Sequence, residues 1–248
     1  ILGPVLVGSL VGINIFNVQI PEFGLLTPLI VMSFVMAIAT FLVYLFLPNR
    51  PMSSNIDTER EKIVLDKNLK ILISIGVIIF TAFALVQSIT AYYVQDRFDI
   101  SLDETAKTTA LLLGTMAFMA IISQLTFVQK YKGNPLNLIK FSLPLFILSC
   151  LSIIFSPNFL FLYLGMALMG LGMGLASPGY TSAASLNADK DNQGAAVGLA
   201  MIAPGIGFAL GPLISGFLYS ISMNLPFIFI LPLFILLAIL IKRLEQLI

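Results

Sequence analysis

Long runs of apolar residues constrain the fold of this chain more than any other feature. A helix that crosses a bilayer needs about 20 mostly apolar residues, because the hydrocarbon core is roughly 30 Å thick and each residue rises about 1.5 Å. A first run covers residues 1–15 and has the composition of the interior of a helix. Seven complete runs follow it, near residues 26–47, 69–94, 106–128, 136–156, 158–180, 194–220 and 224–242.

Composition supports the same fold class. Hydrophobic residues make up 58% of the chain and charged residues 10%, and the mean hydropathy is +1.02. Strands with open edges are not tolerated in lipid, and the runs lack the alternating pattern of a transmembrane barrel. The sequence therefore predicts an all-α membrane protein, a helical bundle with a partial first helix and seven transmembrane helices.

The scarcity of certain residue types argues against several kinds of functional site. The chain has no His, a single cysteine, Cys150, and a net charge of +1, so we expect no metal site, no cofactor and no nucleic-acid partner. No Asp, Glu, Lys or Arg lies deep inside a complete run. Because buried charge usually marks function in a membrane protein, its absence argues against an enzyme and against a proton relay in this part of the chain.

A Gly-Pro pattern occurs twice. Gly3-Pro4-x-x-x-Gly8 opens the chain, and Gly211-Pro212-x-x-x-Gly216 lies in the run at 194–220, where Gly207 extends it. Glycine lets another backbone approach closely, and proline removes a helical hydrogen bond. These helices could be hinges, or they could simply pack tightly. Two copies predict two related halves around a common axis, as in many transporters.

Charge predicts how the chain is oriented. The one long polar segment, residues 48–69, is expected to be a linker, although part of it could form a short amphipathic helix. Alternate loops lie on opposite sides of the membrane. Eleven basic residues lie on the side that holds the linker and the loops with Lys130 and Lys190, and only Arg97 and Lys107 lie on the other side. The linker and the C-terminus are therefore expected in the cytoplasm.

With this arrangement the chain resembles the C-terminal part of a major facilitator superfamily transporter. In that family two six-helix halves are joined by a cytoplasmic linker, and the fifth and eleventh helices carry a Gly-Pro motif, although here Val7 replaces one of its glycines. The turn Asp96-Arg97-Phe98 resembles that of the drug:proton antiporters of the tetracycline-efflux-like branch. The resemblance implies an N-terminal half missing before residue 1. It also implies three parts: residues 1–47 (partial fifth helix and sixth helix), the linker 48–69, and the C-terminal six-helix half 70–248.

Four uncharged side chains are candidates for the substrate pathway. Gln87 and Thr90 follow Phe83 at helical spacing in one run, and Thr115 and Met119 align in the next. A buried amide must find a partner, so Gln87 either bonds to a neighbouring helix or faces a wet cavity. Both readings remain open.

The predicted function is secondary active transport. We expect export of small amphipathic compounds by alternating access, coupled to protons, by a multi-pass protein of the lipid bilayer of the plasma (inner) membrane. The phenylalanines and methionines, and the absence of tryptophan, favour hydrophobic substrates over sugars. The alternatives are a major facilitator that imports a nutrient or moves a metabolite, and a membrane scaffold that transports nothing.

Overall fold

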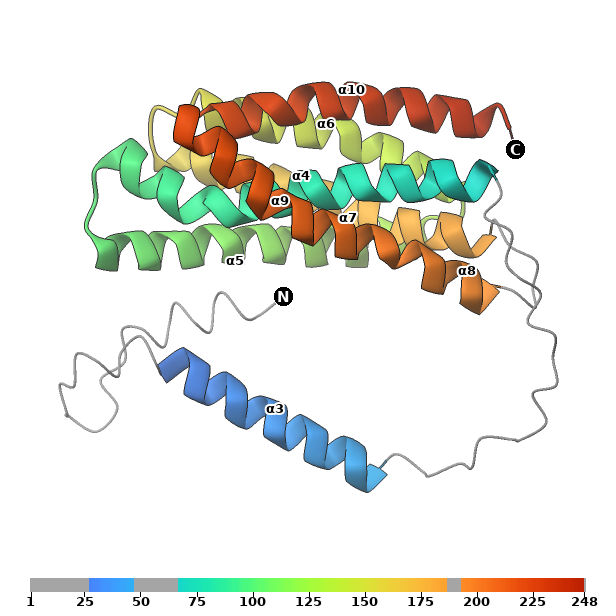
Figure 1. Ribbon diagram of the computed structural model, residues 1–248, viewed down its shortest axis with the longest axis horizontal. Coiled ribbons are helices and arrows are strands. Elements are labelled where there is room, and N and C mark those ends of the chain that lie inside the picture. Colours follow the sequence, from blue (N-terminus) through green and yellow to red (C-terminus); the bar gives the residue numbers. More distant parts are fainter. Residues whose placement is uncertain (1–26, 47–66, 187–192, 248) are drawn as a thin grey trace.

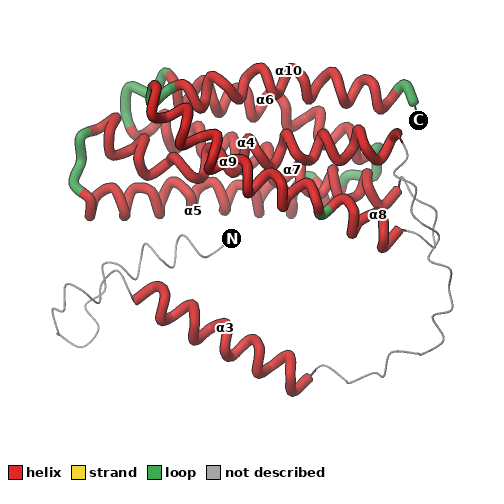
Figure 2. Tube along the Cα trace, viewed as in Figure 1, coloured by secondary structure: helices red, strands yellow, loops and turns green. Residues whose placement is uncertain are grey.

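The computed structural model describes residues 27–46, 67–186 and 193–247, and within these ranges the regular elements are all helices (Figures 1 and 2). The elements are α3 (Thr27–Phe46), α4 (Lys67–Phe98), α5 (Leu102–Thr126), the 3-10 turn η2 (Val128–Lys130), α6 (Pro135–Ile154), α7 (Phe159–Leu186), α8 (Gln193–Ala200), α9 (Ile202–Ile221) and α10 (Leu225–Glu245).

Six helical stretches in the described residues are long and apolar enough to cross a membrane, the last but one formed by α8 and α9 together. This confirms an all-α membrane bundle and a multi-pass integral membrane protein. The run expected at 26–47 forms α3, a helix of 20 residues whose stretch Met32–Phe46 is apolar. Large side chains on α3 are exposed, and Figure 1 shows the helix apart from the others.

The six spans form an antiparallel bundle with two distinct ends. One, the turn end, carries the short connections α4–α5, α6–α7 and α9–α10. The other, the linker end, carries the start of α4, the α5–α6 connection and the C-terminus (Figure 1). Helix α4 packs against α5, α7, α9 and α10, whereas α7 packs against both α5 and α6.

Local chemistry sets the helix ends. Helix α5 begins four residues before the expected 106, because Ser101 caps it: its hydroxyl accepts from the backbone N–H of Glu104, whose carboxylate accepts from the Ser101 N–H. Just before it, Asp99 has φ 49°, a left-handed conformation that Asp tolerates and that ends α4. The α4–α5 turn is therefore specified by a few short polar side chains.

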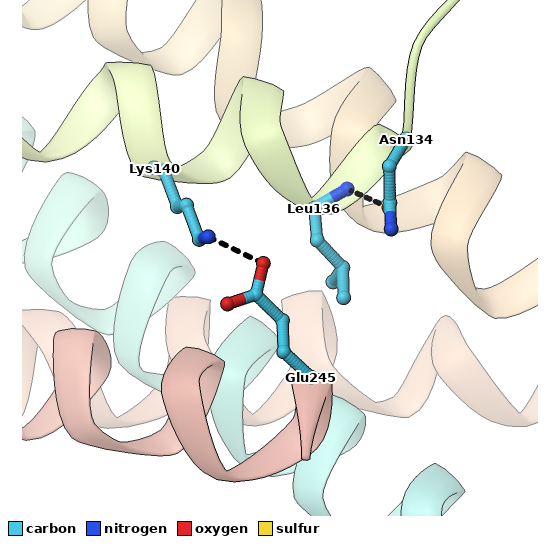
Figure 3. Close-up of polar contacts among 4 residues, drawn as sticks. All are labelled: Asn134, Leu136, Lys140 and Glu245. Carbon is cyan, nitrogen blue, oxygen red and sulfur yellow. Dashed lines mark hydrogen bonds and ion pairs between the residues drawn. The ribbon is translucent and has the colours of Figure 1, made fainter. Parts of the chain in front are cut away.

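At the linker end, α6 is held at its start and to α10. The Asn134 side chain accepts a hydrogen bond of 2.9 Å from the Leu136 N–H, which caps α6 (Figure 3). Lys140 of α6 forms an ion pair with Glu245 of α10 (Figure 3). Deeper in the bundle the rings of Phe146 and Phe234 join the same two helices, stacked with centroids 5.1 Å apart. These contacts fix α10 against α6.

The span expected at 194–220 is interrupted rather than continuous. Helix α8 ends at Ala200, and α9 begins at Ile202 after a turn at Met201. The reason is Pro204, which has no N–H to donate to the carbonyl of Ala200 four residues earlier. The Gly-Pro pattern lies in the second piece, α9.

Candidate functional site

The Gly-Pro pattern of α9 lies against α4. A Cβ added at Gly207 would lie 2.5 Å from Phe80 Cβ and 2.8 Å from the backbone nitrogen of Thr81. One added at Gly211 would lie 2.6 Å from Ala84 Cβ. Real side chains do not approach so closely, so both positions need glycine for the two backbones to meet. The first half of the pattern therefore allows close packing of α9 against α4.

The second half of the pattern faces outward. Gly216 is exposed, and a Cβ added there would meet no atom within 4 Å. Pro212 is also exposed. The earlier copy, Gly3, Pro4 and Gly8, lies outside the described residues. The pattern in α9 thus divides into a packed face and an open face, and the hinge role assigned to it stays a prediction.

A pair of hydroxyls joins α4 to α9 one turn beyond Gly211. Ser88 Oγ and Ser215 Oγ lie 2.7 Å apart, and Ser215 is 1% exposed. Each hydroxyl also lies 3.0 Å from a carbonyl of its own helix, Leu85 O for Ser88 and Pro212 O for Ser215. Since each oxygen carries one proton, one serine donates across the interface and the other donates to its own helix. Glycine contacts and this bond together define the α4–α9 interface.

A tyrosine compensates for the proline at the break in the span. Tyr180 of α7, which is fully buried, donates a hydrogen bond of 2.7 Å from its hydroxyl to Ala200 O, the carbonyl that Pro204 leaves without a helical partner. Its ring fits over Gly76 of α4, where an added Cβ would lie 2.5 Å from the Tyr180 ring carbon Cζ. Three helices therefore meet at the kink.

An open face runs along α4 and α9 and contains the strongest sequence candidate. Gln87 is half-buried and has no hydrogen-bond partner among the residues that the structure describes. One turn earlier lies Phe83, whose ring meets that of Phe208 edge-on with centroids 6.2 Å apart, and Phe208 is 46% exposed. We call Phe83, Gln87 and Phe208 the amide–aromatic patch. An unpaired amide beside exposed rings can bind a molecule that has both polar and apolar parts.

A comparison with protein families found a match over part of the bundle. Residues 133–246 match the family model of the Major Facilitator Superfamily. The match covers α6 to α10, less than half of the chain, and shows a likeness to this family of transporters over that part. A search of curated proteins found no match.

The structure separates the four side chains that the sequence grouped as candidates for a substrate pathway. Thr90 is 1% exposed and donates its hydroxyl proton to Val86 O of its own helix, so it lies in the core and outside the patch. Thr115 donates to Leu111 O within α5, and Met119 is half-buried on that helix. No hydrogen bond links either of them to Gln87. Gln87 alone of the four belongs to the patch.

Polar residues of the bundle gather near the turn end. Tyr219 of α9 donates a hydrogen bond of 2.6 Å to the carboxylate of Asp96 of α4. Arg97 donates to Ser156 O, and Tyr93 donates to Ile153 O at 2.9 Å. In the described residues, no three His, Cys, Asp or Glu side chains are placed to hold a metal ion. These contacts fasten α4 to its neighbours at that end.

Several of these residues were not predicted from the sequence. Ser88 adjoins Gln87 and Ser215 lies within the Gly-Pro pattern, so a search for small polar residues beside glycines could have found them. Phe208 and Tyr180 carry no signal of that kind, because a single sequence does not tell which aromatic ring meets which helix.

Proposed function

We propose that the chain works as part of a secondary active transporter that exports small amphipathic compounds in exchange for protons. The observation that carries this proposal is the half-buried amide of Gln87, which has no hydrogen-bond partner in the described residues and lies beside Phe83 and the exposed ring of Phe208. The family match and the six apolar spans support transport as the general activity.

The composition of the patch favours an amphipathic substrate. An amide that stays without a hydrogen bond in an apolar environment costs about 1 to 3 kcal/mol, so Gln87 needs water or a ligand as a partner. The two phenylalanine rings beside it offer stacking and apolar surface but no further hydrogen bonds. A substrate with one polar group next to an aromatic or aliphatic body satisfies both. A sugar would leave most of its hydroxyl groups without partners here.

The proposed mechanism is alternating access between two halves. The division into residues 1–47, 48–69 and 70–248 is part of this proposal, as is an N-terminal half that precedes residue 1. The patch would face that half across the pathway, while the exposed end of the Gly-Pro pattern at Gly216 would lie along the contact between the halves. The middle turns of the described spans contain no charged side chain. A proton-binding carboxyl group is therefore proposed in the N-terminal half.

Flux measurements with the full-length protein in sealed vesicles test the proposal. With an imposed proton gradient, we expect lipophilic dyes or drugs to move against the proton flow. Inward movement of a nutrient instead would support the uptake alternative, and the absence of flux of any compound would support the scaffold alternative.

The substitution Gln87→Leu tests the site itself. It keeps the size of the side chain and removes the amide, so we expect transport of a polar-headed substrate to fall about tenfold or more, with unchanged insertion. The matched control is Gln129→Leu, at an exposed position in the turn η2, which should transport normally. Equal transport by both variants would show that Gln87 is not part of the substrate pathway.

A further inference from the structure

A hollow opens in a part of the bundle whose helices contribute nothing to the amide–aromatic patch. Helices α5 and α6 both pack against α7, and the hollow lies between them, with a volume of about 400 Å³. Leu171 and Leu175 of α7 form its floor, and Ser123 and Leu145 belong to its sides. Its mouth is marked by Phe141 of α6, which is 55% exposed.

The hollow cannot close by a shift of α5 toward α7, since those two helices already touch. A Cβ added at Gly170 would clash with the carbonyl of Met116, and one added at Gly174 would lie 2.5 Å from the carbonyl oxygen of Ala120. The space is therefore built into the packing of the three helices. The hollow is therefore part of the fold whether or not a ligand occupies it.

The lining of the hollow suits hydrocarbon. Its one buried hydroxyl, that of Ser123, already donates a hydrogen bond of 3.1 Å to Leu171 O. The remaining side walls are leucine, phenylalanine and proline, apart from Tyr131 at the rim. Water or a polar ligand would find almost no hydrogen bonds here, whereas an acyl chain would gain apolar contact on three sides.

Positive charge lies directly beside the rim. Tyr131 lines the hollow, with its ring edge-on to Phe141 at 6.4 Å, and its two neighbours in the chain are Lys130 and Lys132. Both lysines are exposed, and neither has an ion-pair partner within the described part of the chain. Lys140, nearby in sequence, is already paired with Glu245. A Tyr flanked by lysines at a helix end is typical of the membrane interface, where lipid phosphates lie.

We propose that this hollow is a binding site for one acidic phospholipid of the adjoining leaflet. One acyl chain lies between α5 and α6 on the floor formed by α7, and the headgroup phosphate contacts Lys130 and Lys132. Charge complementarity selects an acidic lipid over a zwitterionic one. Each lysine near the surface contributes roughly fivefold to that attraction. The site does not depend on the transport substrate or on the direction of transport.

The absence of tryptophan from the chain makes a direct test possible. Within residues 1–248 the variant Phe141→Trp carries a single tryptophan, at the mouth of the hollow, and any tryptophan elsewhere in the full-length protein would be replaced by phenylalanine. The full-length variant would be reconstituted in zwitterionic vesicles that contain a small fraction of lipid with brominated acyl chains, which quench tryptophan on contact. With a roughly fivefold contribution from each of the two lysines, we expect brominated acidic lipid to bind at the reporter about 25-fold more tightly than brominated zwitterionic lipid. A second reporter, Phe118→Trp, lies exposed in the middle of α5 and should show no preference.

Two further changes separate the parts of the site. Adding Lys130→Gln and Lys132→Gln to the Phe141→Trp protein should abolish the preference, whereas Lys107→Gln, at the opposite end of α5, should leave it unchanged. Leu171→Phe fills the floor and should reduce the preference about fivefold with both lysines present. An unchanged response of the matching Phe118→Trp proteins shows that the bundle is intact.

Three results would overturn the proposal. The first is equal quenching by acidic and zwitterionic lipid at Phe141→Trp. The second is a preference that survives the loss of both lysines or the filling of the floor. The third is a reporter that no lipid reaches, which would mean that another protein segment covers the hollow.

Discussion

At the scale of single residues, the kink in the span formed by α8 and α9 depends on one hydroxyl group. Pro204 leaves the carbonyl of Ala200 without its helical partner, and Tyr180 supplies the missing donor from α7. A break in a transmembrane helix is tolerated where neighbouring helices satisfy the freed backbone groups. The Tyr180 hydroxyl does this directly, at 2.7 Å.

Removal of that hydroxyl should weaken the bundle measurably. Tyr180→Phe keeps the ring over Gly76 and leaves Ala200 O buried without a donor, at a cost of about 1 to 3 kcal/mol. The expected result is a lower midpoint of thermal unfolding in detergent. Tyr92→Phe is the control, since Tyr92 is 63% exposed and its hydroxyl makes no hydrogen bond in the described residues. A Tyr180→Phe protein as stable as this control would show that the carbonyl finds another donor.

The two halves of the Gly-Pro pattern should respond differently to the same substitution. Gly211→Ala places a Cβ 2.6 Å from that of Ala84, so α4 and α9 must separate, and we expect a loss of about 1 to 3 kcal/mol of stability. Gly216→Ala meets no atom and should unfold like the parent protein. Unfolding curves of the two variants, measured side by side, test this. Equal curves would contradict the packing described for Gly211.

Transport measurements on variants of the same pattern distinguish a packing role from a hinge role. Gly216→Leu adds bulk only on the open face, so a stable variant with lost transport would support a role of this face between the halves. A stable variant that transports normally would confine the pattern to the α4–α9 contact.

At the scale of elements, the α4–α9 interface combines close backbones with one side-chain hydrogen bond. The double-mutant cycle of Ser88→Ala and Ser215→Ala isolates that bond. We expect a coupling energy of about 0.6 kcal/mol, the typical size for interhelical hydrogen bonds in membrane proteins. Unfolding of the parent, the two single variants and the double variant supplies the measurement. Strictly additive effects would mean that the two hydroxyls bond only to their own helices.

The elements themselves could be predicted from the sequence, because a span needs a long apolar run and the runs are separated by polar turns. Helix ends were harder. The capping box at Ser101 extends α5 by a turn, and such caps are local chemistry that a hydropathy pattern does not contain. Pro204 indicated a distortion of the helix near Met201. Whether a proline bends or interrupts a helix depends on the neighbouring residues that satisfy the freed carbonyl, and these cannot be read from the sequence.

The candidate site was predicted only in part. The spacing of Gln87 and Phe83 placed them correctly on one face, because helical periodicity follows from sequence alone. The same periodicity grouped Thr90 with them, although it lies a further three residues along and is turned into the core. Phe208 joins the patch from α9, more than a hundred residues away, and its position is decided by how Gly207 and Gly211 seat that helix on α4.

At the scale of the whole molecule, the distribution of lysine and arginine predicts which end of the bundle faces the cytoplasm. Cysteines introduced at the two ends test it, in a protein whose cysteines outside residues 1–248 have been replaced by serine. Cys150 is fully buried and should add little background labelling. In intact cells a membrane-impermeant maleimide should label Ser222→Cys at the turn end, whereas Lys132→Cys at the linker end should react only after permeabilisation. The reverse pattern would invert the proposed orientation.

The central place of α4 has a consequence for how the molecule is made. It is the first of the six described spans to leave the ribosome, yet α9, with which it shares its closest packing, begins about a hundred residues after α4 ends. At about 5 to 20 residues per second, that interval lasts roughly 5 to 20 s. During this time the surface of α4 that Gly207 and Gly211 will cover lies against lipid or the insertion machinery. The helix that packs most closely on the first span is therefore made late, with only α10 of the described spans still to follow.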